Sequence, residues 1–249
     1  MSAVVKVAVT TGPGLVRAAN EDRLGVFGWL GPLETPGPVV LAAGLDAALV
    51  AVVADGLGGH LAGEVASLAA VSGFMADPAG LTDETAVRDR CLEIHADLLE
   101  AAAARPDRNG MGTTLSAVVL RGEDVLVCNV GDSRVYYVEP GLVEQLTADD
   151  VDPLGSGALT QVLGGLPDRP VSPRISRIPV TPGLRLLLCT DGLHGVVSAE
   201  VLRDRAAAPR LEDAVAGLAL AAAEAGAPDN VSICFLEVTA SRPAEENHG

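Results

Sequence analysis

Five aspartates in this chain stand at one end or the other of short apolar runs, each beside glycine or a polar turn residue. A run of this kind has the length of a buried strand, and a side chain at a strand end is held rigidly at the rim of a core. The aspartates are scattered across almost the whole sequence, so only the fold can gather them. The five positions are Asp22, Asp55, Asp132, Asp191 and Asp229.

The succession of the remaining patterns indicates a layered α+β fold rather than a regular alternation of strands and helices. Segments 28–46 and 148–173 are rich in glycine and proline and indicate loops, the first with room for an edge strand and the second with a short element around 159–163. Helical patterns fall at 63–75, 83–104, 199–206 and 211–225, and Ser198 is expected to cap the third of these. Apolar runs between turn residues predict strands at 4–10, 24–27, 47–54, 113–120, 125–130, 135–138, 142–146, 175–180, 184–190 and 231–238.

The second helical segment shows a clear periodicity. Val87, Cys91, Ile94 and Leu98 follow one another at intervals of three or four residues. This spacing places the four side chains on one face of a helix. Pro106 lies just beyond the segment and is expected to end it.

The length of 249 residues and the hydrophobic content of 49% allow one large core. Aromatic residues make up only 2% of the chain, so the core must be built from valine, leucine, isoleucine and alanine. Nothing resembling a flexible linker divides the sequence. We therefore expect a single domain over residues 1–238, followed by a disordered tail over residues 239–249.

The formal net charge of −16 makes nucleic acid and anionic membranes poor partners. The acidic excess also suits a protein that collects cations, although solubility alone is the better explanation of it. No secretory signal is visible, and the longest apolar stretch, 39–54, contains Asp46 and is too short to span a bilayer. We expect a monomer in the cytoplasm, where the four cysteines without Cys-x-x-Cys spacing are buried free thiols: Cys91, Cys128, Cys189 and Cys234.

Carboxylates that meet at one edge of a fold repel one another unless cations compensate their charge. Carboxylate and carbonyl oxygens without paired histidine or cysteine suit Mg²⁺, Mn²⁺ or Ca²⁺. Zinc is disfavoured, since His60, His95 and His194 show no ligand spacing. Two hard cations held close together can share a water, lower its pKa and direct it at phosphorus. Each aspartate alone is also an ordinary turn residue, so the inference rests on their repetition.

Arg17 is the natural phosphate anchor of such a site, because a guanidinium matches two phosphate oxygens in a bidentate fork. An ordinary surface arginine is the other interpretation of this residue.

A set of motifs, in this order along residues 5–238, resembles the bacterial members of the PP2C-type (PPM) metal-dependent serine/threonine protein phosphatases. A single one of these motifs is weak evidence, but seven in order are specific. They are Arg17-x-x-Asn20-Glu21-Asp22, Val53-Ala-Asp55-Gly56-x-Gly58-Gly59-His60-x-x-Gly63-Glu64-x-Ala66-Ser67, Gly112-Thr113-Thr114, Asn129-x-Gly131-Asp132-Ser133-Arg134, Leu159-Thr-x-x-Leu-Gly164, Cys189-Thr-Asp191-Gly192-Leu193 and Asp229-Asn230.

The resemblance implies a four-layer α-β-β-α sandwich, in which two antiparallel sheets are flanked by helix pairs and a metal site lies at one end. It also implies two Mn²⁺ or Mg²⁺ ions. Asp55 would bridge them, and the carbonyl of Gly56 would bind the second ion. Asp191 and Asp229 would complete the first.

Further roles follow from the same resemblance. Glu21 and Asp22 would serve the second ion directly or through water. Asp132 matches the site of a third metal in bacterial members. Arg17 would hold the substrate phosphate, and Asn230 would support the site from behind the ligands.

Two departures from the family pattern stand out. Eukaryotic members have a histidine directly after the Asp-Gly pair, proposed as the general acid, whereas this chain has Leu57; His60 lies three residues later and is expected to fix the start of the following helix. Bacterial members usually read Thr-x-Asp-His before a flap segment. This chain reads Thr147-Ala-Asp149-Asp150 before a short stretch, so the histidine is missing and the flap is abbreviated.

The resemblance implies a phosphatase that hydrolyses phosphoserine and phosphothreonine in proteins by direct attack of a metal-bridging hydroxide, with no covalent enzyme intermediate. Its partners would be phosphorylated proteins, the substrates of bacterial serine/threonine kinases, in signalling. A phosphatase specialised for regulators of sigma factors remains an alternative. So does a non-catalytic relative that binds phosphoproteins as a regulatory module, although no expected metal ligand is lost here.

Overall fold

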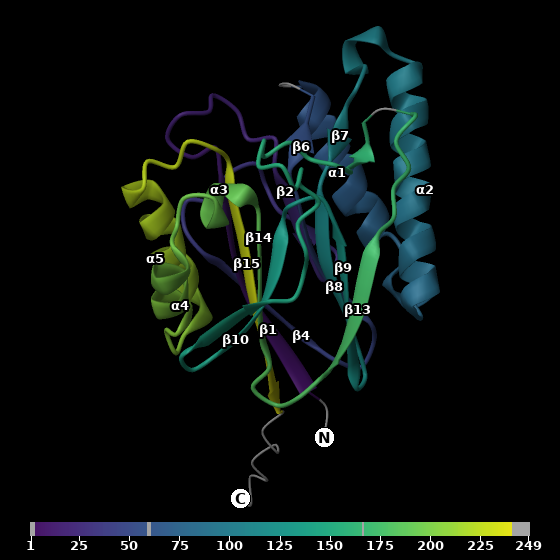
Figure 1. Ribbon diagram of the computed structural model, residues 1–249. Coiled ribbons are helices and arrows are strands. Elements are labelled where there is room, and N and C mark those ends of the chain that lie inside the picture. Colours follow the sequence, from purple (N-terminus) through teal and green to yellow (C-terminus); the bar gives the residue numbers. More distant parts are fainter. Residues whose placement is uncertain (1–2, 59–60, 166, 241–249) are drawn as a thin grey trace, which may run out of the picture.

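Two six-stranded antiparallel sheets lie face to face, and a pair of helices covers the outer face of each (Figure 1). The computed structural model describes residues 3–58, 61–165 and 167–240. The four layers confirm the predicted α-β-β-α sandwich. His60, with its expected role at the start of a helix, lies outside the described residues.

The central strands of each sheet come from distant parts of the sequence. One sheet has the order β11-β10-β14-β15-β1-β4, and the other has the order β13-β9-β8-β5-β2-β3. A small third sheet, β12-β7-β6, lies at one end. The strands are β1 (Ala3–Gly12), β2 (Arg23–Val26), β3 (Trp29–Leu30), β4 (Val39–Gly44), β5 (Leu49–Ala54), β6 (Gly56–Leu57), β7 (Gly112–Thr113), β8 (Leu115–Arg121), β9 (Asp124–Val130), β10 (Arg134–Glu139), β11 (Leu142–Gln145), β12 (Leu163–Gly164), β13 (Arg174–Pro179), β14 (Arg185–Cys189) and β15 (Val231–Ala240).

Two of the helices begin at a residue whose side chain accepts a hydrogen bond from a backbone amide of the first turn. Asp83 accepts a hydrogen bond from the Ala86 amide at the start of α2, and Ser198 accepts one from the Val201 amide at the start of α4, as predicted. The helices are α1 (Leu61–Met75), α2 (Glu84–Ala103), α3 (Asp191–His194), α4 (Ala199–Ala206) and α5 (Leu211–Glu224), with short 3₁₀ turns at Pro78–Gly80 and Pro106–Arg108.

The central strands are mostly apolar because both of their faces are covered. In β8, Ala117 and Val119 pack toward the helices, whereas Val118 and Leu120 pack toward the other sheet. This two-sided burial explains why the predicted strands read as continuous apolar runs. The predicted face of α2 is also confirmed, since its buried residues are Val87, Cys91, Ile94 and Leu98.

Segment 28–46 contains the edge strand for which the sequence left room, β4, which pairs with β1, and also the short strand β3. Several element boundaries differ from the predicted ones by a few residues. The last described strand, β15, runs to Ala240 rather than to 238, because it pairs with β1 from Ala3 to Gly12. The rest of the predicted tail, 241–249, lies outside the described residues.

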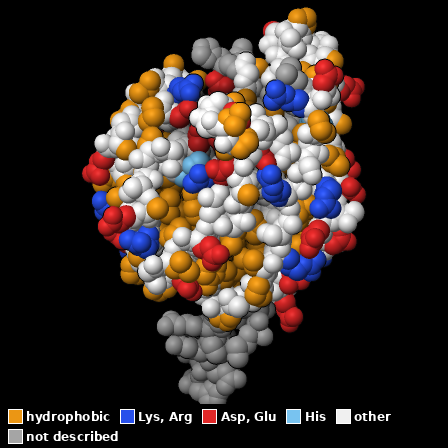
Figure 2. Space-filling model, viewed as in Figure 1, with side chains coloured by type: hydrophobic (Ala, Val, Ile, Leu, Met, Phe, Trp, Pro, Cys, Tyr) orange, Lys and Arg blue, Asp and Glu red, His pale blue; other side chains and the backbone are white. Residues whose placement is uncertain are grey.

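Two composition-based expectations can be compared with the structure. All four cysteines are buried and free, as predicted. None of the helices in the described part of the chain combines the length and apolar composition needed to cross a bilayer. On the face shown in Figure 2, acidic and basic side chains are interspersed with apolar ones, so the acidic excess does not form a single patch there.

Candidate functional site

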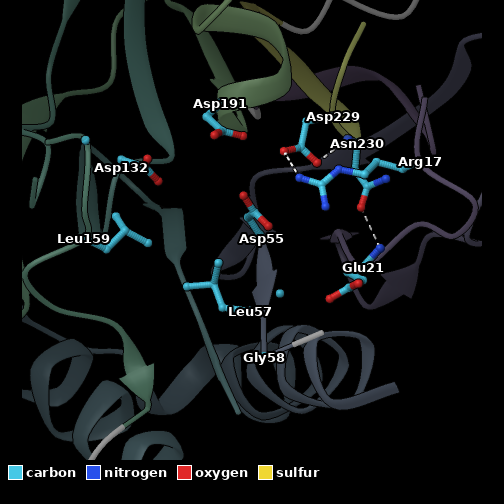
Figure 3. Close-up of a pocket in the computed structure, with 12 residues that line it drawn as sticks. Arg17, Glu21, Asp55, Leu57, Gly58, Asp132, Leu159, Asp191, Asp229 and Asn230 are labelled. Carbon is cyan, nitrogen blue, oxygen red and sulfur yellow. Dashed lines mark hydrogen bonds and ion pairs between the residues drawn. The ribbon is translucent and has the colours of Figure 1, made fainter. Parts of the chain in front are cut away.

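Strand ends and loops from both sheets meet around one pocket at the edge where the small third sheet lies (Figures 1 and 3). The pocket has a volume of about 380 Å³. Eight of the nine predicted site residues line it, and Asp22 does not. The full lining is Arg17, Glu21, Asp55, Gly56, Leu57, Gly58, Asp132, Gly157, Leu159, Asp191, Asp229 and Asn230.

Asp55 lies at the centre of the pocket, directly after β5 (Figure 3). Its backbone is fixed by two threonines. The Asp55 amide donates to the Thr114 hydroxyl at 2.9 Å, and the Thr113 hydroxyl donates to the Asp55 carbonyl at 2.8 Å. Thr114 also contacts the Ser133 hydroxyl at 2.7 Å. The hydroxyl groups thus hold the strand end in place, and the Asp55 carboxylate stays directed at the pocket.

Asp191 is the first residue of α3, at the end of β14. Gly192 follows it, and a Cβ at this position would collide with the backbone carbonyl of Asn230. The absence of a side chain therefore lets α3 approach the Asp229–Asn230 turn closely. The Asp-Gly pair, which looks like a simple turn in the sequence, brings two of the predicted ligands to the same side of the pocket.

Asp229 and Arg17 form an ion pair although they are 212 positions apart (Figure 3). The guanidinium Nη2 lies 2.6 Å from Asp229 Oδ2, and the Asn230 amide donates to Asp229 Oδ1 at 2.8 Å. Both carboxylate oxygens of Asp229 are thus engaged. The negative charges of Asp229, Glu21 and Asp55 raise the pKa of Arg17, with Asp229 as the main cause.

Asn230 links the last strand to the loop after β1. Its Oδ1 accepts from the Glu21 amide at 2.8 Å, and its Nδ2 donates to the carbonyls of Ala19 at 2.8 Å and Pro13 at 3.2 Å. The Ser67 hydroxyl donates to the Glu21 carbonyl at 2.5 Å. This bonding pattern matches the supporting role expected for Asn230.

Asp22 lies behind the pocket rather than in it. Its side chain is buried, and its Oδ2 accepts a hydrogen bond from the Thr190 hydroxyl at 2.8 Å. Thr190 in turn accepts from the Ser232 amide at 3.1 Å. Burial raises the pKa of Asp22 to about 7. The position of Asp22 favours action through its neighbours over direct contact with a ligand in the pocket.

The carboxyl groups of the pocket repel one another electrostatically. Burial is the main cause that raises the pKa of Asp55 well above its ordinary value, and the charges of the other aspartates add to it. Burial also raises the pKa of Asp191, followed by the charge of Asp229. The pKa of Asp132 rises to about 6, through burial and the charge of Asp191. Positive charge in the pocket would relieve this repulsion.

The donor chemistry fits hard divalent cations. The lining offers carboxylate and carbonyl oxygens, and Asp191 Oδ1 is a buried atom without a hydrogen-bond partner. Within the described ranges, however, no group of three or more acidic, histidine or cysteine side chains stands close enough to hold one metal ion. The ion pair with Arg17 occupies Asp229 Oδ2, so a cation at Asp229 would compete with that guanidinium for the same oxygen.

Asp132 stands in the turn between β9 and β10, across the pocket from Arg17 (Figure 3). The carbonyl oxygen of Asp132 lies 3.0 Å from His194 Nε2 at the end of α3. Burial lowers the pKa of His194 to about 4, which keeps its ring neutral at neutral pH. The ring thus connects the turn of Asp132 to the helix that begins with Asp191.

The abbreviated flap is a small hairpin, which we call the roof hairpin (residues 150–160). Val151 pairs with Leu159, and the Thr160 amide donates to the Asp150 carbonyl at 2.7 Å. Gly157 and Leu159 from this hairpin line the pocket. Sequence reasoning noted the short flap but did not identify Leu159 as a lining residue.

Other residues that shape the site were also missed by sequence reasoning. The Gly112-Thr113-Thr114 motif was noted without a role, and the structure shows these threonines bonded to Asp55. Thr190 precedes Asp191 in its motif and supports Asp22. Motif membership was a usable signal for all three threonines.

Comparison with known proteins gives consistent matches. The sequence model of the protein phosphatase 2C family matches residues 40–230. The chain is 36% identical over 146 residues to the serine/threonine phosphatase stp of Listeria monocytogenes, which covers 56% of this chain and 52% of that protein. It is 33% identical over 154 residues to the serine/threonine protein phosphatase PstP of Mycobacterium tuberculosis, covering 59% of this chain and 25% of PstP. The chain thus spans about half the length of the Listeria relative and a quarter of the mycobacterial one.

Solved structures agree with the fold. The crystal structure of the Mycobacterium tuberculosis phosphatase PstP/Ppp superposes with a TM-score of 0.78 at 26% identity, covering 95% of this chain and all of that one (100%). The PstP catalytic domain in complex with two manganese ions superposes with a TM-score of 0.77 at 27% identity, covering 96% of this chain and 100% of that one. Since the family match covers well over half of the sequence, and the fold and the pocket agree with it, the chain belongs to the protein phosphatase 2C family.

Proposed function

We propose that this protein is a divalent-metal-dependent phosphatase that hydrolyses phosphoserine and phosphothreonine in proteins. The observation that carries the proposal is the convergence of Asp55, Asp191 and Asp229 with Arg17 around one pocket. Carboxylates provide the ligands of hard cations, and the guanidinium provides a partner for phosphate. Relatives named serine/threonine phosphatases support the same activity.

Two Mn²⁺ or Mg²⁺ ions would be held by the acidic side of the pocket. Asp55, Asp191 and Asp229 would contribute carboxylates, with Glu21 and the carbonyl of Gly56 as further oxygen donors. Cations held by these residues would supply an activated water for direct attack on phosphorus and positive charge for the phosphoryl group. The related PstP catalytic domain was solved with two manganese ions, which supports this number.

The other two predicted ligands, Asp132 and Asp22, lie away from the group formed by Asp55, Asp191 and Asp229. Asp132 lines the pocket on the side opposite Arg17 and would serve a third ion. Asp22 would act from behind the pocket, through Thr190 and the strand ends to which Thr190 is bonded. The burial of Asp22 and its unpaired Oδ1 favour a structural role in the site, or a role through a bound water.

Arg17 would bind and orient the substrate phosphate. Its side chain is about half exposed, at 54%, so it can move from Asp229 to an incoming anion. A guanidinium fork fixes two phosphate oxygens and leaves the face of phosphorus opposite the leaving oxygen open to in-line attack. Leu57, at the position of the general acid of eukaryotic members, has no proton to donate. The leaving oxygen must therefore receive its proton from another group.

Phosphorylated proteins would be the partners, as substrates of serine/threonine kinases. We propose that the protein acts as a cytoplasmic monomer. A non-catalytic phosphoprotein-binding module with the same fold would keep the pocket but show no turnover. A measurement of turnover therefore distinguishes the phosphatase from the non-catalytic binding module.

The test is hydrolysis of p-nitrophenyl phosphate and of a phosphothreonine peptide in the presence of Mn²⁺ or Mg²⁺. We expect turnover that EDTA abolishes and that Asp191→Asn reduces by about three orders of magnitude, because lost Lewis-acid stabilisation amounts to several kcal/mol. Activity that survives EDTA or Asp191→Asn contradicts the proposal. Binding of Mn²⁺ in calorimetry without turnover of any phosphopeptide supports the non-catalytic alternative.

A further inference from the structure

Two leucines stand among the mostly polar lining residues of the pocket, on the side that also carries Asp132. Leu57 and Leu159 point into the pocket on the side away from Arg17 (Figure 3). Leu57 comes from β6, and Leu159 comes from the roof hairpin. We call this pair the apolar wall. Neither leucine can bind a cation or a phosphate, so the wall has no part in the chemistry proposed above.

Leu159 is held by regular backbone bonding of the roof hairpin. On either side of its pairing with Val151, the Thr160 amide donates to the Asp150 carbonyl at 2.7 Å and the Asp152 amide donates to the Ala158 carbonyl at 2.8 Å. The Asp152 carboxylate closes the tip, because it accepts from the Leu154 amide at 3.0 Å and the Ser156 hydroxyl at 2.7 Å. These bonds give the hairpin a defined shape.

Asp150 fastens the base of the hairpin to the rest of the site. Its side chain is almost fully buried, with 1% exposed. Its Oδ2 accepts from the Gly131 amide at 3.0 Å and from Gln161 Nε2 at 2.6 Å, and its Oδ1 is paired with Arg174. The Asp150 amide also donates to the Gly131 carbonyl at 3.0 Å. The carboxylate therefore joins the hairpin to the turn that carries Asp132.

Gln161 extends this anchorage to the segment before β13. Its Oε1 accepts from the Ser172 amide at 2.9 Å. Arg174, which pairs with Asp150, is the first residue of β13 and also donates to the Ala148 carbonyl at 3.2 Å. The base of the hairpin is thus bonded to two separate segments of chain, the Gly131 turn and residues 172–174, and Leu159 is positioned by them.

A phosphorylated residue on Arg17 would place its neighbours in the substrate against the walls of the pocket. A polar side chain that is pushed against Leu57 and Leu159 loses water and gains no hydrogen bond from these two side chains, which is unfavourable. An aliphatic side chain gains from the same contact. The acidic side of the pocket repels aspartate and glutamate at this position as well.

We propose that Leu159 is a specificity-determining residue which, together with Leu57, selects phosphoproteins with an aliphatic residue next to the phosphorylated serine or threonine, and that Asp150 is the residue that positions it. The inference rests on the proposed phosphatase function and adds its substrate class.

The first experiment compares phosphothreonine peptides that differ only in the residue directly before or directly after the phosphothreonine. Leucine at one of these positions should raise kcat/KM about tenfold over serine, the low end of discrimination by an apolar pocket. Hydrolysis of p-nitrophenyl phosphate, which has no flanking residue, is measured in parallel. Equal kcat/KM for the leucine and serine peptides at both positions overturns the proposal while leaving the phosphatase function intact. Absence of turnover on every substrate overturns both.

The second experiment uses three variants on the same peptides. Leu159→Ala and Asp150→Asn should each reduce the leucine-to-serine preference to about threefold or less, mainly through KM, because the apolar wall is shortened or released. Asp152→Asn is the matched control, since it alters the exposed tip of the same hairpin but not its base, and it should keep the full preference. An unchanged preference in Leu159→Ala contradicts the assignment.

The positioning role of Asp150 is tested without activity. Hydrogen–deuterium exchange should speed up jointly in segments 129–133 and 150–162 of Asp150→Asn, because the substituted amide offers a donor to groups that themselves donate. Faster exchange in 150–162 alone contradicts the link to the Asp132 turn. Should Asp150→Asn not fold, Gln161→Ala removes one donor from the same carboxylate, and the same joint change is expected at smaller amplitude.

Discussion

The two sides of the pocket are fixed in different ways. Asp55, Asp191 and Asp229 stand at the ends of strands that are buried on both faces, so their positions depend on the packing of the whole sandwich. Leu159 on the opposite side belongs to a short hairpin that one buried carboxylate, Asp150, holds at its base. The positions of the three aspartates therefore cannot change without a change in the packing of the strands. The sequence of the roof hairpin, in contrast, can vary without disturbing the sheets. This division separates the residues of the reaction from those of substrate choice.

The largest expected effect is on the acidic side. Asp55→Asn should lower kcat/KM for p-nitrophenyl phosphate with Mn²⁺ by about three orders of magnitude, because a central cation ligand is lost. The melting temperature in EDTA should not fall, since the substitution removes a carboxyl crowded by like charges. Asp46→Asn, at an exposed loop position, is the control and should change neither quantity. An activity loss of less than tenfold in Asp55→Asn would mean that the strand ends are not the centre of the reaction.

Arg17 comes next. Arg17→Lys should lower kcat/KM for the phosphothreonine peptide by about ten- to a hundredfold, because an ammonium is a point charge that cannot form the bidentate fork. Arg105→Lys changes an exposed arginine that pairs with Asp107 away from the pocket, and should have no effect. Isothermal titration with inorganic phosphate in the presence of Mn²⁺ provides a direct measure. Equal phosphate affinity in Arg17→Lys and the unaltered protein would assign the anchor to another group.

A pH effect on stability is expected from the buried carboxyl groups in and behind the pocket. Asp22 and Asp132 have ordinary pKa values of 3.8 that rise to about 7 and about 6 in the folded protein. The folded state thus binds more protons than the unfolded chain from about pH 4 to 7, and stability falls as pH rises through this range. His194 acts in the opposite direction between pH 6.5 and 4, but as a single group.

We therefore expect the melting temperature in EDTA to fall between pH 5 and pH 7.5, by on the order of 5 °C. Mn²⁺ should reduce the fall, because cations compensate the carboxylates. Differential scanning calorimetry at several pH values gives the comparison. A melting temperature that rises over this range in EDTA would show that the buried carboxyls do not govern the pH dependence.

The smallest effect is expected at the tip of the roof hairpin. Leu154 is 92% exposed there and does not line the pocket. Leu154→Ser should change the free energy of unfolding by less than about 0.5 kcal/mol, and peptide kcat/KM by less than about twofold. Chemical denaturation and steady-state kinetics measure the two quantities. A marked loss of peptide turnover with normal hydrolysis of p-nitrophenyl phosphate would extend the selecting surface to the tip.

Sequence patterns predicted the elements better than their arrangement. The interval between Val87 and Leu98 identified the buried face of α2, because helix geometry converts spacing directly into orientation. The strand order could not be predicted from composition, since most central strands are similar runs of valine, leucine and alanine. The family resemblance provided the architecture that these runs leave open.

For the site, too, the sequence predicted which residues take part better than it predicted how their side chains are arranged. Motifs identified eight lining residues, but not that Arg17 bonds Asp229 or that Asp22 lies behind the pocket. These facts depend on how strand ends approach one another in space. Helix α3 was missed because it is only four residues long and its Asp-Gly start is typical of a turn. The missing flap histidine was visible in the sequence, whereas the anchoring role of Asp150 required the contacts.

The position of β15 has a consequence for synthesis of the protein. A ribosome delivers this strand after all the other described strands, yet it lies between β14 and β1 in its sheet. Until it emerges, β10 and β14 have no contact with β1 within that sheet, and Asp229 is not yet in place. A nascent chain therefore contains most of the fold but no complete site. The pocket is complete only once the last described strand has inserted and Asp229 has reached Arg17.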